Sequence, residues 1–256
     1  MIIYSWNMLF RTKKLDEAFA FVANAQSDIF CLQEVPDAFL ERLKTLPYHL
    51  AEAIDVERLF SPVKRLHLVI LSRHPIISYN SFLFPEYWPT LPLRTRLFVR
   101  LMRPMHWTTI RNRSGLYANI ETKKGPVRVF NLHTALTRPD LRVREFELAM
   151  AERDPSVPTI VCGDFNTIES PRISILNWFL GGSLMDVVRY KRERTQIERH
   201  CIEHELHNPL RGKSTHAFAD SQLDHILVSH SLSVKEAAIL RKRYGSDHHP
   251  IRVEIS

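Results

Sequence analysis

Short apolar runs recur along this chain, and most of them end in a small group of polar residues. Each run is bounded by turn residues and is too short for a typical helix, which predicts a strand. The predicted strands are MIIYSW (1–6), DIFCLQEV (28–35), LHLVILS (66–72), PTIVCGDFN (158–166), LDHILVS (223–229) and IRVEIS (251–256). The segments GLYANIET (115–122) and VRVFNLHT (127–134) flank the turn signal KKGP, which predicts a β-hairpin.

Helical spacing of apolar residues appears between these runs. In residues 14–25, Leu15, Ala18, Phe19 and Val22 share one helical face. Residues 36–46 follow a proline suited to a first helical turn, and residues 139–153 form an amphipathic pattern that starts near another proline. Strands interspersed with helices, without an internal repeat, predict a layered α/β domain.

Two segments depart from this pattern, and we expect both to be insertion loops. Residues 80–114 are rich in Pro, Trp and Arg, and six arginines but no acidic residue lie from Pro89 to Ser114. Within that segment, Arg96, Arg100 and Arg103 fall on one helical face. Residues 189–213 are highly charged, and their HELH sequence is one residue short of a zinc-protease motif. We therefore expect a solvated helix or loop there rather than a metal site.

Composition narrows the possible partners and compartment. The chain has 256 residues and a net charge of +7, which favours polyanionic partners such as nucleic acid or an anionic membrane. The three cysteines lack CxxC spacing, as is typical of reduced thiols in the cytosol. No transmembrane segment is expected, because no run reaches about 18 apolar residues. The first ten residues lack signal-peptide features, so we expect a cytoplasmic protein.

Candidate chemistry concentrates where the predicted strands end. The polar endings are SWN, CLQE, FNLHT, VCGDFN, LDH and SDHH. Strand ends on a rigid sheet are frequent positions for binding and catalytic residues. Six such endings in one chain indicate strand ends that converge on one site.

These segments, in this order, resemble the endonuclease/exonuclease/phosphatase superfamily, the fold of pancreatic deoxyribonuclease and of exodeoxyribonuclease III-type repair enzymes. The resemblance spans residues 4–251 and is carried by SWN, LQEV, ILSRHPI, NLHT, GDFNT, LDHILVS and SDHHPI. It implies a single domain over residues 1–256. It also implies a four-layered α/β sandwich, with two mixed, mostly antiparallel sheets packed face to face and flanked by helices.

A hard cation fits the oxygen-bearing residues of this set. Glu34 ends a buried run with no basic residue near it in sequence, so its carboxylate requires a counter-ion. Asn7 and Asp247 offer further oxygen ligands, which suit Mg²⁺ or Mn²⁺ rather than zinc. The resemblance implies that Glu34 is the principal metal ligand, with Asn7 and Asp247 nearby.

The remaining members supply acid–base groups. Asp164 and Asn166 are two residues apart, which places both side chains on one face of an extended chain. The resemblance implies that Asp164 activates water and that Asn166 binds phosphate or fixes the water. It also pairs Asp224 with His248, which would stabilise charge on the phosphate. His133 would do the same from another side or protonate the leaving oxygen. We expect the adjacent His225 and His249 to point away.

The implied reaction is metal-assisted hydrolysis of a phosphate ester, and the substrate stays open. The first alternative is a nuclease or DNA-repair phosphodiesterase. Its expected substrate contacts are Arg94, Arg96, Arg100, Trp107 and Arg111. The second alternative is a phosphoinositide phosphatase or sphingomyelinase-type phospholipase that contacts a membrane through the basic, amphipathic residues 89–107. A packed insertion with a solvated basic face would support neither, and a third alternative is a catalytically inactive binding module.

Overall fold

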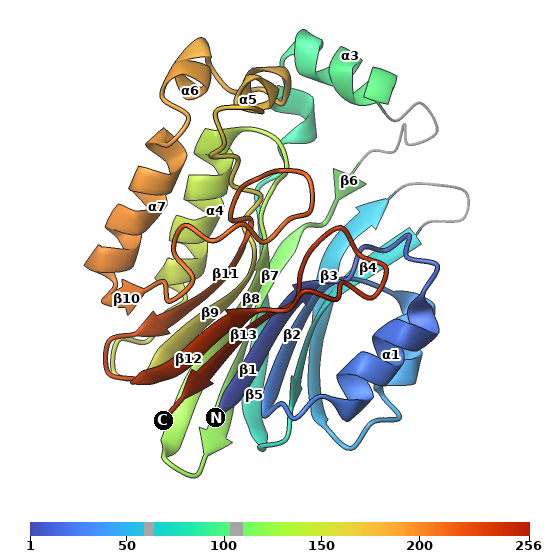
Figure 1. The fold of residues 1–256 in the computed structure, drawn as a ribbon, viewed down its shortest axis with the longest axis vertical. Coiled ribbons are helices and arrows are strands. Elements are labelled where there is room, and N and C mark those ends of the chain that lie inside the picture. The colour runs from blue at the N-terminus through green and yellow to red at the C-terminus, as the bar shows by residue number, and fades with distance from the viewer. Residues whose placement is uncertain (59–63, 103–109) are drawn as a thin grey trace.

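Two β-sheets pack face to face in this chain, as Figure 1 shows. The computed structural model describes residues 1–58, 64–102 and 110–256. Within these residues the first sheet has seven strands in the order β12-β13-β1-β2-β4-β3-β6, and the second has six in the order β10-β11-β9-β8-β7-β5. The strands of the first sheet are β1 (Ile2–Asn7), β2 (Ile29–Pro36), β3 (His49–Arg58), β4 (Lys64–Ser72), β6 (Ile110–Arg111), β12 (Val234–Ile239) and β13 (Ile251–Ile255). Those of the second are β5 (Ile76–Leu83), β7 (Ser114–Thr122), β8 (Gly125–His133), β9 (Thr159–Asp164), β10 (Leu206–His207) and β11 (Asp224–Ser229).

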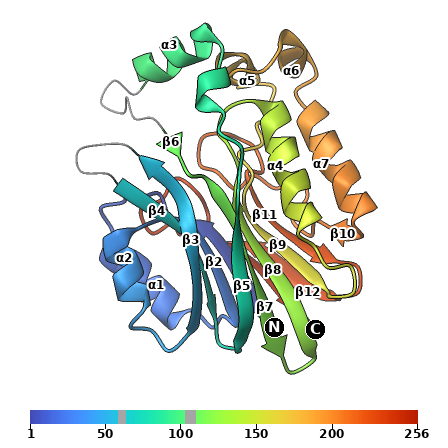
Figure 2. The ribbon, with the colours of Figure 1, turned by 180° about the vertical axis from the view of Figure 1, so that it is seen from behind.

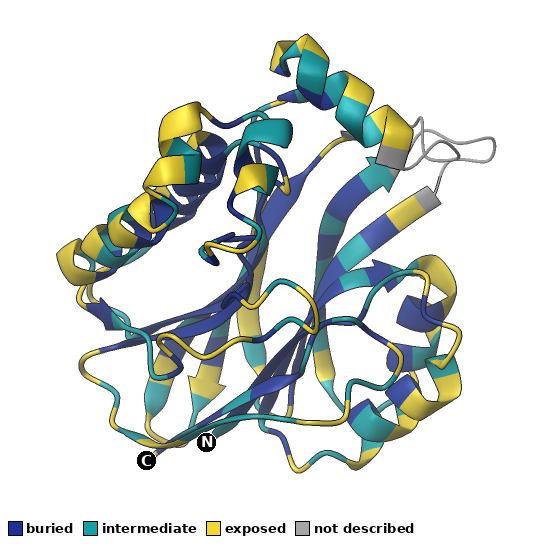
Figure 3. Cartoon of the chain, turned by 45° about the horizontal axis from the view of Figure 1, so that its top comes forward, coloured by how far each residue is buried: buried dark blue, intermediate teal, exposed yellow. Residues whose placement is uncertain are grey.

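Helices cover the outer face of each sheet. α1 (Leu15–Asn24) and α2 (Asp37–Leu43) lie against the first sheet, and α4 (Pro139–Ala151) and α7 (Arg192–Glu203) lie against the second, as Figures 1 and 2 show. One apolar cluster fills the space between the sheets, and two others lie under the helices. Figure 3 shows the same layering, with buried strands and helices exposed on their outer sides. The predicted four-layered α/β sandwich is confirmed.

Strand register brings the polar strand ends together. β1 and β2 are parallel, as are β8 and β9, while the other strand pairs of the described residues are antiparallel. The β8–β9 register sets His133 beside Asp164, and the β9–β11 register sets Asp224 beside the same residue. Sequence-distant residues therefore become neighbours through backbone pairing alone.

Buried amides connect the two sheets beneath these strand ends. The side chain of Gln33 on β2 donates from Nε2 to Oδ1 of Asn131 on β8, 2.7 Å away. Asn131 in turn donates to the backbone carbonyls of Leu32 and Val69 in the opposite sheet. Because unpaired amides are costly in an apolar core, these bonds favour one alignment of the sheets.

The segment 80–114, expected to be a loop, contains regular structure. It begins inside β5 and includes a 3-10 turn (Trp88–Thr90), α3 (Leu93–Met102), β6 and the start of β7. Arg96 and Arg100, predicted to share a helical face, both lie on α3. Arg103 lies outside the described residues. The helix forms because residues 93–102 are mostly good helix formers and contain no proline, while Pro92 precedes them.

Most of the segment 189–213, where a solvated helix or loop was expected, is α7 and the short strand β10. Ile197 and Cys201, one helical turn apart, are buried against the second sheet. Glu193 and Arg194 are buried as well, each in an ion pair, with Arg142 and Glu169 respectively. Although α7 is rich in charged residues, one of its faces is buried, and the charged side chains on that face form ion pairs within the protein.

Other expectations concern the cysteines and a membrane span. Cys31, Cys162 and Cys201 are buried free thiols. Among residues 1–58, 64–102 and 110–256, no helix is long and apolar enough to cross a bilayer.

Candidate active site

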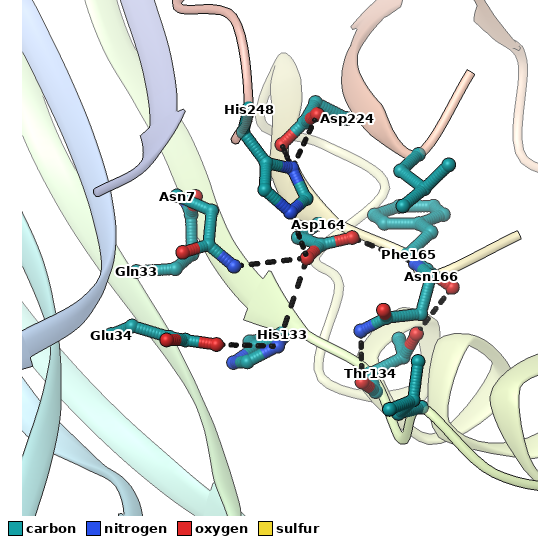
Figure 4. Close-up of polar contacts among 12 residues, drawn as sticks. Asn7, Gln33, Glu34, His133, Thr134, Asp164, Phe165, Asn166, Asp224 and His248 are labelled. Carbon is teal, nitrogen blue, oxygen red and sulfur yellow. Dashed lines mark hydrogen bonds and ion pairs between the residues drawn. The ribbon is translucent and has the colours of Figure 1, made fainter. Parts of the chain in front are cut away.

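Asp164 lies at the centre of the converging strand ends (Figure 4). Its Oδ2 accepts a hydrogen bond from Asn7 Nδ2 at 3.0 Å and lies 3.7 Å from Nε2 of His133 and 3.6 Å from Nε2 of His248. Its other oxygen accepts from the backbone N–H of Asn166 at 2.8 Å. Burial and the nearby Asp224 raise the pKa of Asp164, although His248 and His133 oppose this shift. The carboxylate is therefore held in place, and one of its oxygens faces two imidazoles.

His248 is fixed from behind by Asp224, as the resemblance implied. Its Nδ1 donates to the Asp224 carboxylate, 2.9 Å from Oδ2 and 3.1 Å from Oδ1. Burial disfavours the charged ring, but Asp224 and Asp164 outweigh burial and raise the pKa of His248 to about 10. The imidazole thus presents a protonated Nε2 toward Asp164.

A second carboxylate–imidazole pair was missed by the sequence analysis. Nδ1 of His133 donates to Oδ2 of Asp55 at 2.8 Å. Burial opposes the charged ring of His133, but Asp55 outweighs it and raises the His133 pKa to about 9. Burial of Asp55 likewise opposes its charge, but His133 lowers the Asp55 pKa overall. The only sequence signal for Asp55 was an acid flanked by the apolar Ile54 and Val56, where the structure has an irregular pairing of β3 with β4.

Glu34 lies beside His133 and adopts a left-handed backbone. Its φ of 56° occurs at a bulge between Leu32 and Val35, where β2 is irregularly paired with β4. Glu34 Oε2 accepts from the backbone N–H of Phe10 at 3.2 Å, and Oε1 lies 4.0 Å from Nε2 of His133. A basic group therefore stands near Glu34 in space, although none does in sequence. The left-handed backbone of Glu34 is a local strain of the kind that is frequent at functional sites.

The SDHHPI segment bends at Asp247, directly after a turn at Tyr244 and Gly245. Tyr244 and Gly245 have positive φ values of 49° and 96°. Asp247 Oδ1 lies 3.9 Å from Nε2 of His248, so both side chains face one region. His249 turns away and donates from Nδ1 to the carbonyl of Leu240 at 2.8 Å.

Another histidine, His216, enters the site beside Asp247 and was not predicted. Its Nε2 lies 3.6 Å from Asp247 Oδ2, and its ring meets the ring of His248 edge to face at 4.7 Å. Its Nδ1 accepts from the backbone N–H groups of Phe218 and Ala219, both at 3.1 Å. An accepting Nδ1 carries no proton, so the proton sits on Nε2 and His216 is a donor toward Asp247.

The donor set fits a hard cation. Asp247 Oδ1 is buried and lacks a hydrogen-bond partner among the described residues, as expected for an oxygen that ligates a metal. Burial opposes the charged form of Asp247, but His216 and His248 lower its pKa to about 2. Ligand atoms of described residues gather in two groups, Asp164/Asp224/His248 and His216/Asp247/His248. Glu34 is in neither group.

Asn7 and Asn166 are both in the site, and both amides are engaged. Asn7 Oδ1 accepts from the backbone N–H of Leu9 at 3.0 Å while Nδ2 binds Asp164. Asn166 Nδ2 donates to the carbonyl of Thr134 at 3.0 Å. His225, by contrast, points away as predicted and stacks on Phe165.

The arginines expected to contact substrate have different positions. Arg94 donates to the carbonyls of Trp178 and Gly182, and Arg96 to those of Leu91 and Pro89, so both hold the chain together. Arg100 is exposed on α3, and Arg111 is exposed on β6. Trp107 lies outside the described residues.

Comparison with known proteins agrees with this geometry. Residues 4–248 match the model of the Endonuclease/Exonuclease/phosphatase family. No match was found among curated proteins. An endonuclease/exonuclease/phosphatase from Beutenbergia cavernae is similar in structure, with a TM-score of 0.73 at 16% identity over 100% of this chain and 71% of that chain.

Two further solved structures share the fold with similar scores. A mannosyl-6-phosphatase from Bacteroides thetaiotaomicron has a TM-score of 0.67 at 17% identity, covering 100% of this chain and 99% of that chain. A 3′ phosphatase from Neisseria, solved with a product DNA hairpin, has a TM-score of 0.65 at 16% identity with the same coverage. The match over nearly the whole sequence, together with the site around Asp164, shows that this chain is a phosphoesterase-type hydrolase of the endonuclease/exonuclease/phosphatase family.

Proposed function

We propose that this chain hydrolyses a phosphodiester by attack of water, with Asp164 as the general base. The observation that carries the proposal is the position of Asp164 Oδ2 within 3.7 Å of two imidazole Nε2 atoms, each held by its own carboxylate. The raised pKa of Asp164 makes its carboxylate a better proton acceptor than an exposed aspartate.

The two imidazoles have a different role from Asp164. His248 and His133 are donors at Nε2, and their raised pKa values keep the rings protonated at neutral pH. They therefore stabilise negative charge on the phosphate oxygens, and His133 can deliver a proton to the leaving oxygen. Asn166 is proposed to orient the phosphate or the attacking water from the other side of Asp164.

A divalent cation completes the proposed site. Glu34 and Asp247 would hold Mg²⁺ or Mn²⁺, with Asn7 as a neutral oxygen donor. When bound, the ion supplies positive charge that stabilises the phosphate during attack. His216 supports this arrangement because its Nε2–H restrains the carboxylate of Asp247.

The nuclease or DNA-repair alternative retains some support. The net charge of +7 favours a polyanion, and one structural neighbour was solved with DNA. Against it, Arg94 and Arg96 already donate to backbone carbonyls of this chain.

A catalytically inactive binding module is the least supported alternative, because the full set of acid–base residues is present.

A substrate panel tests the proposal. Purified protein would be incubated with Mg²⁺ and plasmid DNA, abasic DNA, RNA, phosphoinositides, sphingomyelin or a generic bis-phosphodiester. We expect hydrolysis of at least one substrate, abolished by a chelator and by Asp164→Asn. Equal release of product by wild-type and Asp164→Asn protein would refute the role of this site.

A further inference from the structure

The short helix α3 turns its leucines outward. Leu93, Leu97 and Leu101 follow each other at one-turn spacing and are 69%, 53% and 80% exposed. A surface helix ordinarily buries such an apolar stripe against the protein core. Arg100 is exposed on the same side of the helix.

Specific contacts on the opposite side of α3 fix this orientation. Arg94 donates to the carbonyls of Trp178 and Gly182, at 3.1 and 2.6 Å. Phe98 stacks on Phe179 of α5 (Ile175–Phe179), with ring centroids 4.9 Å apart. Thr95 is fully buried. The outward position of the leucines is therefore a consequence of how the helix is anchored.

A second exposed apolar group lies on α6 (Leu184–Val188), close to α5. Leu184 and Val188 are 66% and 75% exposed, and Met185 between them is also exposed. Figure 1 shows α3, α5 and α6 together at one end of the molecule. We call the outward-facing Leu93, Leu97, Leu101, Leu184, Met185 and Val188 the apolar cap.

Basic residues accompany the apolar cap. Arg189, Lys191 and Arg192 follow α6 directly and are exposed, and Arg192 lies 3.8 Å from Asp186 of α6. No acidic residue lies from Pro89 to Ser114, the segment that contains α3. Exposed leucines with flanking cations fit the interface of an anionic lipid surface. Nucleic-acid interfaces are more polar, and leucines would gain little there.

The helix α5, which contacts both α3 and α6, is bound to the loops that leave the active site. The loop after His133 is held because the backbone N–H of Arg138 donates to the carbonyl of Leu180, at 2.9 Å, just after α5. The loop after Asn166 is held because Asn177 Nδ2 on α5 donates to the carbonyl of Ile168 at 3.1 Å. The elements that carry the cap are therefore connected through α5 to the loops that follow His133 and Asn166.

We propose that the apolar cap docks this chain onto an anionic lipid membrane. We further infer that the phosphate ester it hydrolyses belongs to a lipid headgroup, an extension that rests on the proposed function. Docking inserts the leucines among lipid chains at the interface while the neighbouring arginines and lysine face the anionic headgroups.

Vesicle co-sedimentation tests the docking without reference to catalysis. The full chain would be spun with phosphatidylcholine vesicles, with and without phosphatidylserine. We expect binding to the anionic vesicles, and a loss of at least about tenfold in partitioning for Leu93→Gln/Leu97→Gln/Leu184→Gln/Val188→Gln. The matched control, Ile77→Gln/Ile202→Gln, removes exposed apolar residues outside the cap and should bind as wild type does.

Other outcomes overturn the docking proposal. Equal sedimentation of wild type and cap variant, or no binding to anionic vesicles, contradicts it. Loss of DNA binding in a cap variant that still binds vesicles also contradicts the proposal. So does conversion of a wild-type dimer to a monomer in a cap variant with unchanged vesicle binding.

Activity assays separate this proposal from the proposed function. The cap variant should hydrolyse a soluble bis-phosphodiester as fast as wild type does. Its hydrolysis of a lipid phosphodiester carried in anionic vesicles should fall at least about tenfold. An equal fall on both substrates contradicts a docking role. Asp164→Asn should keep vesicle binding, and vesicle binding by a chain that hydrolyses no ester would refute the proposed function alone.

Discussion

Asp164 Oδ2 and His248 Nε2 lie 3.6 Å apart, and His133 Nε2 approaches the same oxygen from another side at 3.7 Å. Each imidazole donates its Nδ1 proton to a separate buried carboxylate, Asp224 or Asp55. The arrangement leaves both Nε2–H groups directed at the position where a phosphate and a water would meet Asp164.

Removing either partner of the central contact should abolish most activity. We expect Asp164→Asn and His248→Gln each to lower kcat by at least about 10²-fold, because each removes one proton-transfer or charge-stabilising group. His249→Gln is the matched control, since this adjacent histidine binds Leu240 instead. Single-turnover rates close to wild type in either site variant would contradict the assigned roles.

Metal binding should depend on Glu34 and Asp247. Glu34→Gln and Asp247→Asn each remove one charged oxygen ligand, so we expect weaker Mn²⁺ binding by electron paramagnetic resonance and a higher Mg²⁺ requirement in the activity assay. Glu121→Gln, an exposed acid on β7, should leave both measurements unchanged. Identical metal titrations for wild type and both ligand variants would exclude this site.

Asp55 should control the ionisation of His133. Asp55→Asn removes the carboxylate that raises the His133 pKa to about 9, so the pKa of the imidazole should fall. Since the proposed acid is the protonated ring, the alkaline limb of the pH–kcat profile should move to lower pH. Asp37→Asn disrupts a similar pair with His67, outside the site, and should leave the profile unmoved. An unshifted limb in Asp55→Asn would show that His133 does not titrate in the reaction.

His216 can be tested with two isosteric substitutions. His216→Gln keeps a donor near the Nε2 position, whereas His216→Asn keeps an acceptor near Nδ1 for the Phe218 and Ala219 N–H groups. If the Nε2–H restrains Asp247, His216→Gln should retain more kcat and Mn²⁺ affinity than His216→Asn. The reverse order, with a large loss of thermal stability in His216→Gln, would assign His216 to holding the loop.

The Asp224–His248 pair should make metal-free stability depend on pH. Folding raises the His248 pKa from its ordinary value of 6.5 to about 10. Its contribution is therefore complete below about pH 6.5 and is lost as the pH rises through about 10. In a chelator, the Tm difference between wild type and His248→Gln should be larger near pH 6 than near pH 10. A difference that does not change with pH would contradict a protonated, paired His248.

Much of the fold and part of the site could be predicted from the sequence alone. Apolar runs and helical spacing predicted the strands and the flanking helices, because these patterns reflect burial on one or both faces. The motifs around Asp164, Asp224 and His248 predicted a shared site. Each motif lies at one end of a predicted strand, and the motifs follow one another in the order that the family resemblance requires.

Tertiary structure alone decided which side chains meet. Asp55 and His216 joined the site through a β-bulge and a loop, which leave no periodic signal in the sequence. Arg94 and Arg96 became structural because neighbouring carbonyls satisfied their guanidinium groups, and the leucines of α3 faced outward because polar contacts anchored the helix on its other side. Sequence periodicity shows which residues are apolar. The direction in which a side chain points, and the residues that it contacts, depend on how segments distant along the chain pack together.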